Sequence, residues 1–347
     1  MEFAFSSVRG ALLAFSLSAP AFGAATYDSQ WALANTGQRV CRFDGKNCLD
    51  GKEGADTKAQ EAWKWNRDCS AIVVAVLDSG VDQRHPDLEQ NLIPGKSFVD
   101  DVVSSDPQDD NLHGTHVSGI IAGAGSESQG VVGVCRKARL LPVKVGDKEG
   151  FLTDADILEG IAFAVSKRAK VINASFGGNT PNQLVKDAMA KANGTLFVVA
   201  AGNGDMFGRG FSIDAKPVYP AAYDLPNMVV VAATNSRDEL GTFSNFGAGR
   251  VQIAAPGVNI VSAFPMRTTE EMAANGIPVE SGALDGTSMA TPYVAGAAAL
   301  LWSTIPGTAA LEIKRRLLLS VDKIPALEGK VQSGGRLNMA KLFVHGI

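Results

Sequence analysis

Short, almost wholly apolar runs recur along the chain, and stretches with the periodicity of amphipathic helices separate them. A run that is apolar at every position, rather than at alternate positions, is typical of a strand buried on both faces of a sheet. Such strands alternating with helices predict a mostly parallel sheet that is covered by helices on both faces. The predicted strands are residues 71–77, 139–145, 170–175, 195–200, 228–233 and 251–255.

Two of the intervening stretches predict helices in detail. In residues 153–168, Thr153 is placed to cap the helix with Asp156 three residues on. A second helix is predicted to open at Thr180 and Pro181. The core-facing stripe of the first helix is predicted to be Ile157, Leu158, Ile161, Ala162 and Val165, and that of the second Leu184, Val185, Ala188 and Met189.

Composition narrows the class of protein. The 347 residues are 46% hydrophobic, which excludes a disordered or collagen-like chain. The formal net charge is -4, and no large basic surplus indicates a nucleic-acid partner. We find no internal repeat or linker, so the simplest reading is one continuous domain after the N-terminal leader.

The first 25 residues have the order of a secretory signal peptide. Arg9 precedes a short apolar stretch, and a run of small residues follows Pro20. The apolar stretch is too short to span a bilayer, and no later segment reaches the length of a membrane anchor. The alternative is an N-terminal core helix. The sequence therefore predicts a leader at 1–25 and a single domain at 26–347, without an evident pro-segment.

The four cysteines agree with export, because disulfides persist in oxidising compartments. Four cysteines allow three pairings. Cys41 and Cys48 flank a short turn, so proximity favours that pair and leaves Cys69 with Cys135. The alternative is a set of buried thiols. A metal site is disfavoured, because no histidine lies at a usable spacing from either pair.

Three segments carry reactive side chains next to apolar elements. Asp78 ends the first run, His113 opens a helix of small residues, and Ser288 precedes a further apolar helix. Each alone has an ordinary explanation, such as a turn aspartate or a capping serine. Together they supply the hydroxyl, imidazole and carboxylate of nucleophilic serine catalysis, in the order Asp, His, Ser.

Five motifs follow one another along the chain: Val-Ala-Val-Leu-Asp-Ser-Gly-Val-Asp (74–82), His-Gly-Thr-His-Val-Ser-Gly (113–119), Val-Ile-Asn-Ala-Ser-Phe-Gly-Gly (171–178), Ala-Ala-Gly-Asn (200–203) and Gly-Thr-Ser-Met-Ala-Thr-Pro (286–292). With these motifs in this order, the chain resembles the subtilisin-like serine proteases, the subtilase family, from about residue 30 to residue 338. The resemblance implies a three-layer α/β fold around a mainly parallel seven-stranded sheet.

The resemblance implies a role for each catalytic position. Ser288 matches the nucleophile, His113 the general base and later acid, and Asp78 the carboxylate that orients the histidine. Asn203 matches the side chain that stabilises the oxyanion, together with the backbone N–H of Ser288. His116, one turn after His113, is expected to be structural.

The resemblance also implies a substrate-binding segment. Ser175, Phe176 and Gly177 match the backbone that pairs with an extended peptide, and Ala201 and Gly202 of the Ala-Ala-Gly-Asn motif are also expected to bind substrate. Polypeptides in extended conformation are therefore the expected substrates. We expect no nucleic-acid partner, no membrane anchor and a monomeric chain.

Two further expectations come from the family's fold. The strands at 71–77 and 139–145 are parallel neighbours there, which brings Cys69 and Cys135 within disulfide distance. No cofactor is expected for the chemistry. A structural calcium ion is an expectation carried by Asp87, which matches a carboxylate ligand in relatives, although the asparagine of that site is missing from the loop at 124–131.

The sequence thus predicts a secreted serine endopeptidase that hydrolyses peptide bonds through an acyl-enzyme on Ser288. The localisation is expected to be extracellular or periplasmic. The alternatives are a peptide ligase or macrocyclase on the same scaffold, and an inactive peptide-binding homologue. The presence of Asp78, His113, Asn203 and Ser288 together argues against the last of these.

Overall fold

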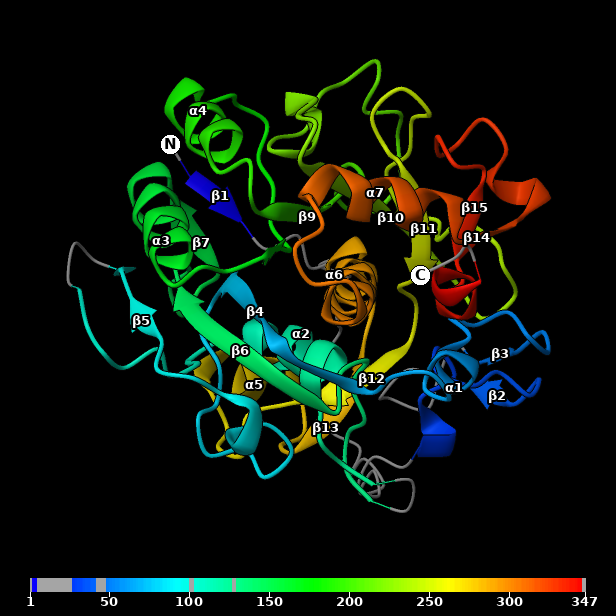
Figure 1. Ribbon diagram of the computed structural model, residues 1–347. Helices are drawn as coiled ribbons and strands as arrows, with labels where there is room; N and C mark the ends of the chain where they lie inside the picture. Colours follow the sequence, from blue (N-terminus) through cyan, green and yellow to red (C-terminus); the bar gives the residue numbers. More distant parts are fainter. Residues whose placement is uncertain (1, 5–26, 42–47, 100–102, 127–128, 345–347) are drawn as a thin grey trace.

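The computed structural model describes residues 2–4, 27–41, 48–99, 103–126 and 129–344. Among these residues the main sheet has nine strands, so the prediction of seven is wrong (Figure 1). All six predicted strands are present in it. In spatial order the strands are β14 (Val321–Lys323), β15 (Gly335–Leu337), β11 (Ile253–Pro256), β10 (Met228–Thr234), β9 (Leu196–Ala200), β8 (Val171–Ala174), β4 (Asp68–Asp78), β6 (Lys137–Lys144) and β5 (Lys96–Ser97).

The additional strands explain the miscount. β5, β14 and β15 are two or three residues long and lie at the sheet's ends, so they show no apolar run. Every neighbouring pair that the structure describes in this sheet is parallel except β14 with β15. The mostly parallel sheet is therefore confirmed.

Helices cover both faces of the sheet, which confirms three layers (Figure 1). β4 shows why its sequence is continuously apolar: Val74 and Val76 belong to one core, while Ala75 and Leu77 belong to the core on the opposite face. The α-helices are α1 (Ala59–Ala62), α2 (His113–Ala122), α3 (Asp154–Ser166), α4 (Gln183–Lys191), α5 (Glu270–Asn275), α6 (Thr287–Thr304) and α7 (Ala310–Leu319).

The first face carries α6, α2 and α7, and the second carries α3 and α4. α6 packs against β4, β8, β9 and β10 and is buried through its first sixteen residues, which explains why it is apolar on all sides. The minor strands are β1 (Glu2–Ala4) with β7 (Phe151–Thr153), β2 (Arg39–Val40) with β3 (Leu49–Asp50), and β12 (Ile260–Ala263) with β13 (Ser281–Leu284). Short 3-10 helices are η1 (Tyr27–Ser29), η2 (Glu89–Asn91), η4 (Ala221–Tyr223), η5 (Pro325–Leu327) and η6 (Met339–Phe343).

The cap of α3 is confirmed, but its predicted inner stripe is partly wrong. The hydroxyl of Thr153 accepts a hydrogen bond from the backbone N–H of Asp156. Ala162 and Val165, however, are exposed. A Cβ on Gly160 would lie 2.6 Å from Cγ1 of Val145, so glycine lets this face of α3 approach β6 and turns the predicted stripe partly outward.

α4 begins slightly later than predicted. Asn182 is its N-cap and accepts hydrogen bonds from the N–H groups of Leu184 and Val185. Val185 and Met189 are buried as expected, while the side chain of Leu184 is 65% exposed. The helix packs against the core through Val185 and Met189, and the side chain of Leu184 lies outside this contact.

Both predicted disulfides are confirmed. Cys41 pairs with Cys48, and Cys69 pairs with Cys135 at a Cα–Cα distance of 5.6 Å. The second bridge joins the start of β4 to the chain just before β6, since these strands are parallel neighbours. The spatial reason for the pairing is thus the sheet order.

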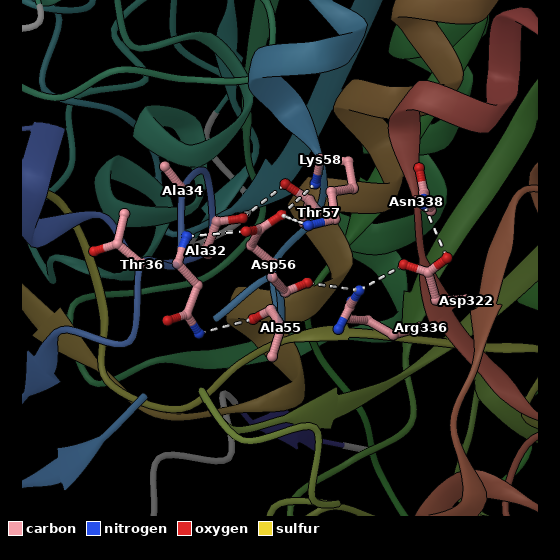
Figure 2. A network of polar contacts seen from close by, with 12 residues as sticks. Ala32, Ala34, Thr36, Ala55, Asp56, Thr57, Lys58, Asp322, Arg336 and Asn338 are labelled. Carbon is pink, nitrogen blue, oxygen red and sulfur yellow. Dashed lines mark hydrogen bonds and ion pairs between the residues drawn. The ribbon is translucent and has the colours of Figure 1, made fainter. Parts of the chain in front are cut away.

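A network of polar contacts joins the N-terminal segment to the C-terminal strands (Figure 2). Asp56 accepts hydrogen bonds from the N–H groups of Asn35 and Lys58. Arg336, which is buried, donates to the carboxylate of Asp322 at 2.8 Å and forms a second ion pair with Asp238. Arg336 also donates to the carbonyl oxygen of Gly54 at 3.4 Å, so the network joins residues 35–58 to β14 and β15.

The N-terminal leader lies largely outside the described residues, so it stays a prediction; residues 2–4 form β1. Within the described ranges, none of the helices has the length and apolar character needed to cross a membrane.

Candidate active site

Asp78 and His113 meet where β4 ends and α2 begins. Nδ1 of His113 donates to Oδ1 of Asp78 at 2.8 Å, and both side chains are buried. The backbone N–H of Ser79 also donates to Oδ1, while Oδ2 of Asp78 has no partner among the described residues. A buried carboxylate against one ring nitrogen fixes the tautomer and stabilises a positive charge on the imidazole.

Glycine permits this meeting. Gly80 has φ +107°, a conformation that favours glycine, in the turn after β4. A Cβ on Gly114 would clash with the carbonyl oxygen of Gly80, so the first turn of α2 lies directly on that turn. The glycines of the two motifs therefore set how closely His113 approaches Asp78.

Ser288 is the second residue of α6 and is 4% exposed. Its hydroxyl donates to the carbonyl oxygen of Ser175 at 3.1 Å, and the hydroxyl of Ser175 donates to the carbonyl oxygen of Ser288 at 3.0 Å. This reciprocal pair joins the end of β8 to the start of α6. The serine thus lies at the positive N-terminal end of a long buried helix.

Asn203 lies beside Ser288 in the loop after β9. Its Oδ1 accepts hydrogen bonds from both the N–H and the hydroxyl of Thr287, each at 2.8 Å. Thr287 holds the side-chain oxygen of Asn203, so the amide nitrogen Nδ2 is directed toward Gly286. A Cβ added to Gly286 would lie 3.3 Å from this nitrogen. A hydrogen-bond donor is therefore fixed next to the serine.

A cavity of about 270 Å³ lies beside Ser288 and Asn203, and the described residues that line it include neither Asp78 nor His113. Ser288 and Asn203 line it together with three of the expected substrate-binding residues, Ser175, Phe176 and Gly177, and with Gly202. Ala201 does not line it, because that residue is completely buried in the core behind the wall.

Sequence reasoning missed several residues of the cavity. Phe211, Val218 and Asn245 line it but lie in loops outside the five motifs. Asn245 donates to the carbonyl oxygen of Ala201 and accepts from the N–H of Gly204, so it supports the loop that carries the oxyanion-stabilising candidate. No local pattern indicates these positions, because only the tertiary fold brings them to the cavity.

His116 is placed as expected for a structural residue. Its Nε2 contacts the carbonyl oxygens of Ile260 and Gly282 at 3.0 and 3.1 Å, so it carries the proton there. Complete burial lowers the pKa of His116 to about 3, so its side chain stays neutral.

The loop matched to a calcium site does not fit a cation in its described part. The carboxylate of Asp87 accepts a hydrogen bond from the N–H of Val131, and the carbonyl oxygen of Gln129 accepts from Ser126. The guanidinium of Arg136 donates to the carbonyl oxygen of Gly125 at 2.6 Å, so a positive charge already lies on the loop. Among the described residues, no cluster of three or more His, Cys, Asp or Glu side chains could hold a metal. Residues 127 and 128 lie outside the described part.

A mostly parallel α/β sheet with an aspartate–histidine pair and a serine near its carboxyl edge defines a class, the serine hydrolases of α/β fold. Comparison with known families makes the assignment specific: residues 70–346 match the family described as the Subtilase family. The chain belongs to this family, and it is a serine-type endopeptidase.

Three relatives illustrate the similarity. The chain is 37% identical to thermitase of Thermoactinomyces vulgaris over 286 residues, which cover 82% of this chain and 92% of thermitase. It is 42% identical to subtilisin E of Bacillus subtilis (strain 168) over 250 residues, 72% of this chain and 60% of the relative. It is 39% identical to the major intracellular serine protease of the same strain over 251 residues, 71% of this chain and 73% of the relative.

Proposed function

We propose that the endopeptidase reaction proceeds through an acyl-enzyme on Ser288, with His113 as base and Asp78 as its partner. The hydroxyl of Ser288 turns from the carbonyl of Ser175 and passes its proton to Nε2 of His113 as Oγ attacks the scissile carbonyl carbon. The imidazolium that forms is stabilised by the buried carboxylate of Asp78. The observation that carries the proposal is the 2.8 Å contact between Asp78 and Nδ1 of His113.

The second half of the reaction uses the same groups in reverse. The imidazolium of His113 gives its proton to the leaving amine as the peptide C–N bond breaks. Water then attacks the acyl carbon of the ester on Ser288 while His113 takes a proton from that water. Breakage of the ester bond returns a proton to Oγ and releases the new carboxyl end of the substrate.

Asn203 and the backbone N–H of Ser288 are proposed to bind the oxygen that becomes negative in each step. The two hydrogen bonds from Thr287 support this role, because they hold Oδ1 and so orient the Nδ2 donor before substrate arrives. A donor that is already oriented needs no reorganisation when charge develops.

Polypeptides in extended conformation are the proposed substrates. Ser175, Phe176, Gly177 and Gly202 line the cavity beside Ser288, and a cavity with these backbone-rich walls suits main-chain pairing with a peptide. Gly177 leaves room for such an approach, since no side chain stands between its backbone and the ligand.

We also propose that residues 1–25 are a cleaved leader, that 26–347 form the catalytic domain, and that the protein is secreted and monomeric. The two disulfides support secretion, since such bonds persist in oxidising compartments. Family membership alone is not sufficient, because one relative is named as an intracellular protease. N-terminal sequencing and fractionation of the producing cells test this proposal, and an intact leader on a cytoplasmic protein would contradict it.

A fluorophosphonate probe tests the catalytic assignment. We expect the wild type to be labelled at Ser288 and to cleave a denatured polypeptide, and the Ser288→Ala variant to do neither. His113→Ala should also lose labelling, because the hydroxyl then has no base. Labelling of a different serine, or undiminished cleavage by Ser288→Ala, would overturn the assignment.

A further inference from the structure

The helix that carries His113 begins without a cap of its own. Leu112 occupies the N-cap position, and its side chain makes no capping hydrogen bond among the described residues. The backbone N–H groups at the start of α2 are bound instead by side chains from outside the helix. Oδ1 of Asn111 accepts from the N–H of His113 at 3.2 Å, and Oγ of Ser79 accepts from the N–H of Gly114 at 3.0 Å.

The carboxylate of Asp109 holds this arrangement together. Oδ2 accepts from both the N–H and the hydroxyl of Thr115, at 2.9 and 2.6 Å. Oδ1 accepts from the hydroxyl of Ser79 at 2.9 Å and from the N–H of Asn111 at 3.0 Å. One buried side chain therefore contacts the residue after Asp78 on one side and the first turn of α2 on the other.

We propose that Asp109 is a positioning residue for catalysis, which acts by fixing His113 against Asp78 through its hydrogen bonds to Ser79 and Thr115. This inference rests on the proposed function of His113. Asp109 contacts neither the cavity nor the reacting groups, and it works by joining the end of β4 to the start of α2. A small shift between these two elements would lengthen the contact between Nδ1 of His113 and Oδ1 of Asp78.

The chemistry of the four donors requires a carboxylate. An ionised carboxylate accepts at both oxygens, whereas an amide has one accepting oxygen and an NH₂ group that only donates. In an Asp109→Asn variant the NH₂ group would face either Thr115 or the Ser79 side, and the donors there would lose their acceptor. The negative charge also lies at the N-terminal end of α2, where a helix stabilises anions.

The surroundings of Asp109 make its ionised form costly to bury. The side chain is 3% exposed, and this burial raises the pKa of the Asp109 carboxyl to about 6, while Thr115, Lys144 and Ser79 oppose the rise. Lys144 of β6 is the cation nearby, and its amino group donates to the carbonyl oxygen of Ser79 and to Asp110. The other ionisable groups beside the cluster are Asp78 at the end of β4, His113 at the start of α2, and Asp82, whose backbone N–H donates to the hydroxyl of Thr115 at 3.0 Å.

Steady-state kinetics of Asp109→Asn on a soluble chromogenic peptide test the proposal. We expect kcat at pH 8 to fall at least tenfold, with KM within twofold of the wild type, in protein that near-UV circular dichroism shows to be folded. The acid limb of kcat/KM should also change. In the wild type, protonation of Asp109, whose pKa burial raises to about 6, adds a second inactivating proton to the acid limb. The acid limb of log kcat/KM should therefore be steeper in the wild type than in Asp109→Asn.

Asp56→Asn is the matched control. Asp56 is also a buried carboxylate that accepts backbone N–H groups, but it belongs to the network between residues 35–58 and the C-terminal strands (Figure 2). We expect this variant to be less stable yet to keep the wild-type kcat and the wild-type acid limb. The same loss of kcat in both variants would reduce the role of Asp109 to general folding and overturn the proposal.

Ser79→Ala keeps the proposal testable where Asp109→Asn does not fold. Removal of the Ser79 hydroxyl breaks the contact between Asp109 and β4, and we expect a several-fold loss of kcat without a change in KM. Wild-type kinetics in folded Ser79→Ala or Asp109→Asn protein would overturn the inference. A wild type as inactive as Ser288→Ala would instead overturn the proposed function, so the two failures are distinguishable.

Discussion

At the scale of single residues, the arrangement depends on side chains that are held by a second residue before substrate arrives. Thr287 binds the oxygen of Asn203 twice, and Asp78 binds one nitrogen of His113. Groups fixed in this way stabilise charge without first having to reorient.

Removal of the amide donor should therefore affect turnover rather than binding. We expect Asn203→Ala to lower kcat by about 10²–10³-fold with little change in KM, because the donor acts on charge that develops only in the transition state. Asn182→Ala, at the N-cap of α4 and outside the cavity, serves as the control and should keep kcat. A loss that appears mainly in KM would contradict the role proposed for Asn203.

Two buried ionisable residues make opposite contributions to the pH dependence of stability. The lowered pKa of His116 means that the unfolded chain binds more protons between about pH 3 and 6.5, so this residue destabilises the fold as the pH falls. The raised pKa of Asp109 means that the folded chain binds the extra proton between about pH 4 and 6, so this residue stabilises the fold as the pH falls.

Because His116 and Asp109 change the stability in opposite directions as the pH falls, a variant without the Asp109 carboxyl should show the destabilising contribution of His116 more clearly. We expect the free energy of unfolding of Asp109→Asn, relative to its parent, to decrease by up to about 1.4 kcal/mol for each unit from pH 6 to pH 4. Urea unfolding in a Ser288→Ala background, which prevents self-digestion, measures this difference. Equal pH slopes for the two proteins would show that Asp109 does not titrate in this range.

At the scale of elements, two local arrangements differ from what the sequence predicted: the loop matched to a calcium site, and the buried face of α3. The loop after α2 is closed by its own hydrogen bonds and by Arg136, with Asp87 bound to the backbone of Val131. Likewise, the close contact of Gly160 with β6 accompanies a helix whose Ile157 and Ile161 are buried as periodicity predicts, while Ala162 and Val165 are exposed.

Chelation should therefore leave the protein unchanged. We expect excess EDTA to shift the Tm by less than about 1 °C and to leave proteolysis at its starting rate, because the guanidinium of Arg136 already supplies positive charge to the loop. Differential scanning calorimetry with EDTA, and then with added Ca²⁺ or Mg²⁺, measures this. A large fall in Tm that Ca²⁺ alone restores would show that the loop binds calcium.

At the scale of the whole molecule, two crosslinks constrain very different lengths of chain. The bridge from Cys69 to Cys135 has a sequence separation of 66, and that from Cys41 to Cys48 has a separation of 7. Loop-closure entropy increases with the length of the closed loop, so the longer bridge restricts the unfolded chain more.

The two disulfides should thus differ in their effect on stability. In the loop-entropy description, replacing Cys69 and Cys135 with serine costs about 4 kcal/mol, and replacing Cys41 and Cys48 costs about 2 kcal/mol. Denaturant unfolding of both double variants in a Ser288→Ala background gives the comparison. The reverse order of stabilities would show that local packing, rather than chain entropy, dominates at these sites.

Some features of the molecule could be predicted because their signal is local. The continuous apolar runs at β4, β8 and β9 identify buried strands, and Thr153 identifies the start of α3. The short strands β5, β14 and β15 could not be found, since two or three residues carry no periodicity. The exposure of Leu184 and Val165 was also missed, because the rotation of a helix depends on what it packs against.

The sequence by itself determined the class of fold, both disulfide pairs and, through five motifs, the candidates Asp78, His113, Asn203 and Ser288. The strands and the motifs could be recognised because each is a run of contiguous residues whose spacing reflects backbone geometry, and the second disulfide pair followed once Cys41 was assigned to Cys48. Only the tertiary structure decided which residues line the cavity with them, among them Phe211 and Val218, and that Asp109 joins β4 to α2. These contacts arise between segments far apart along the chain, where the order of strands in the sheet sets distance and sequence spacing does not.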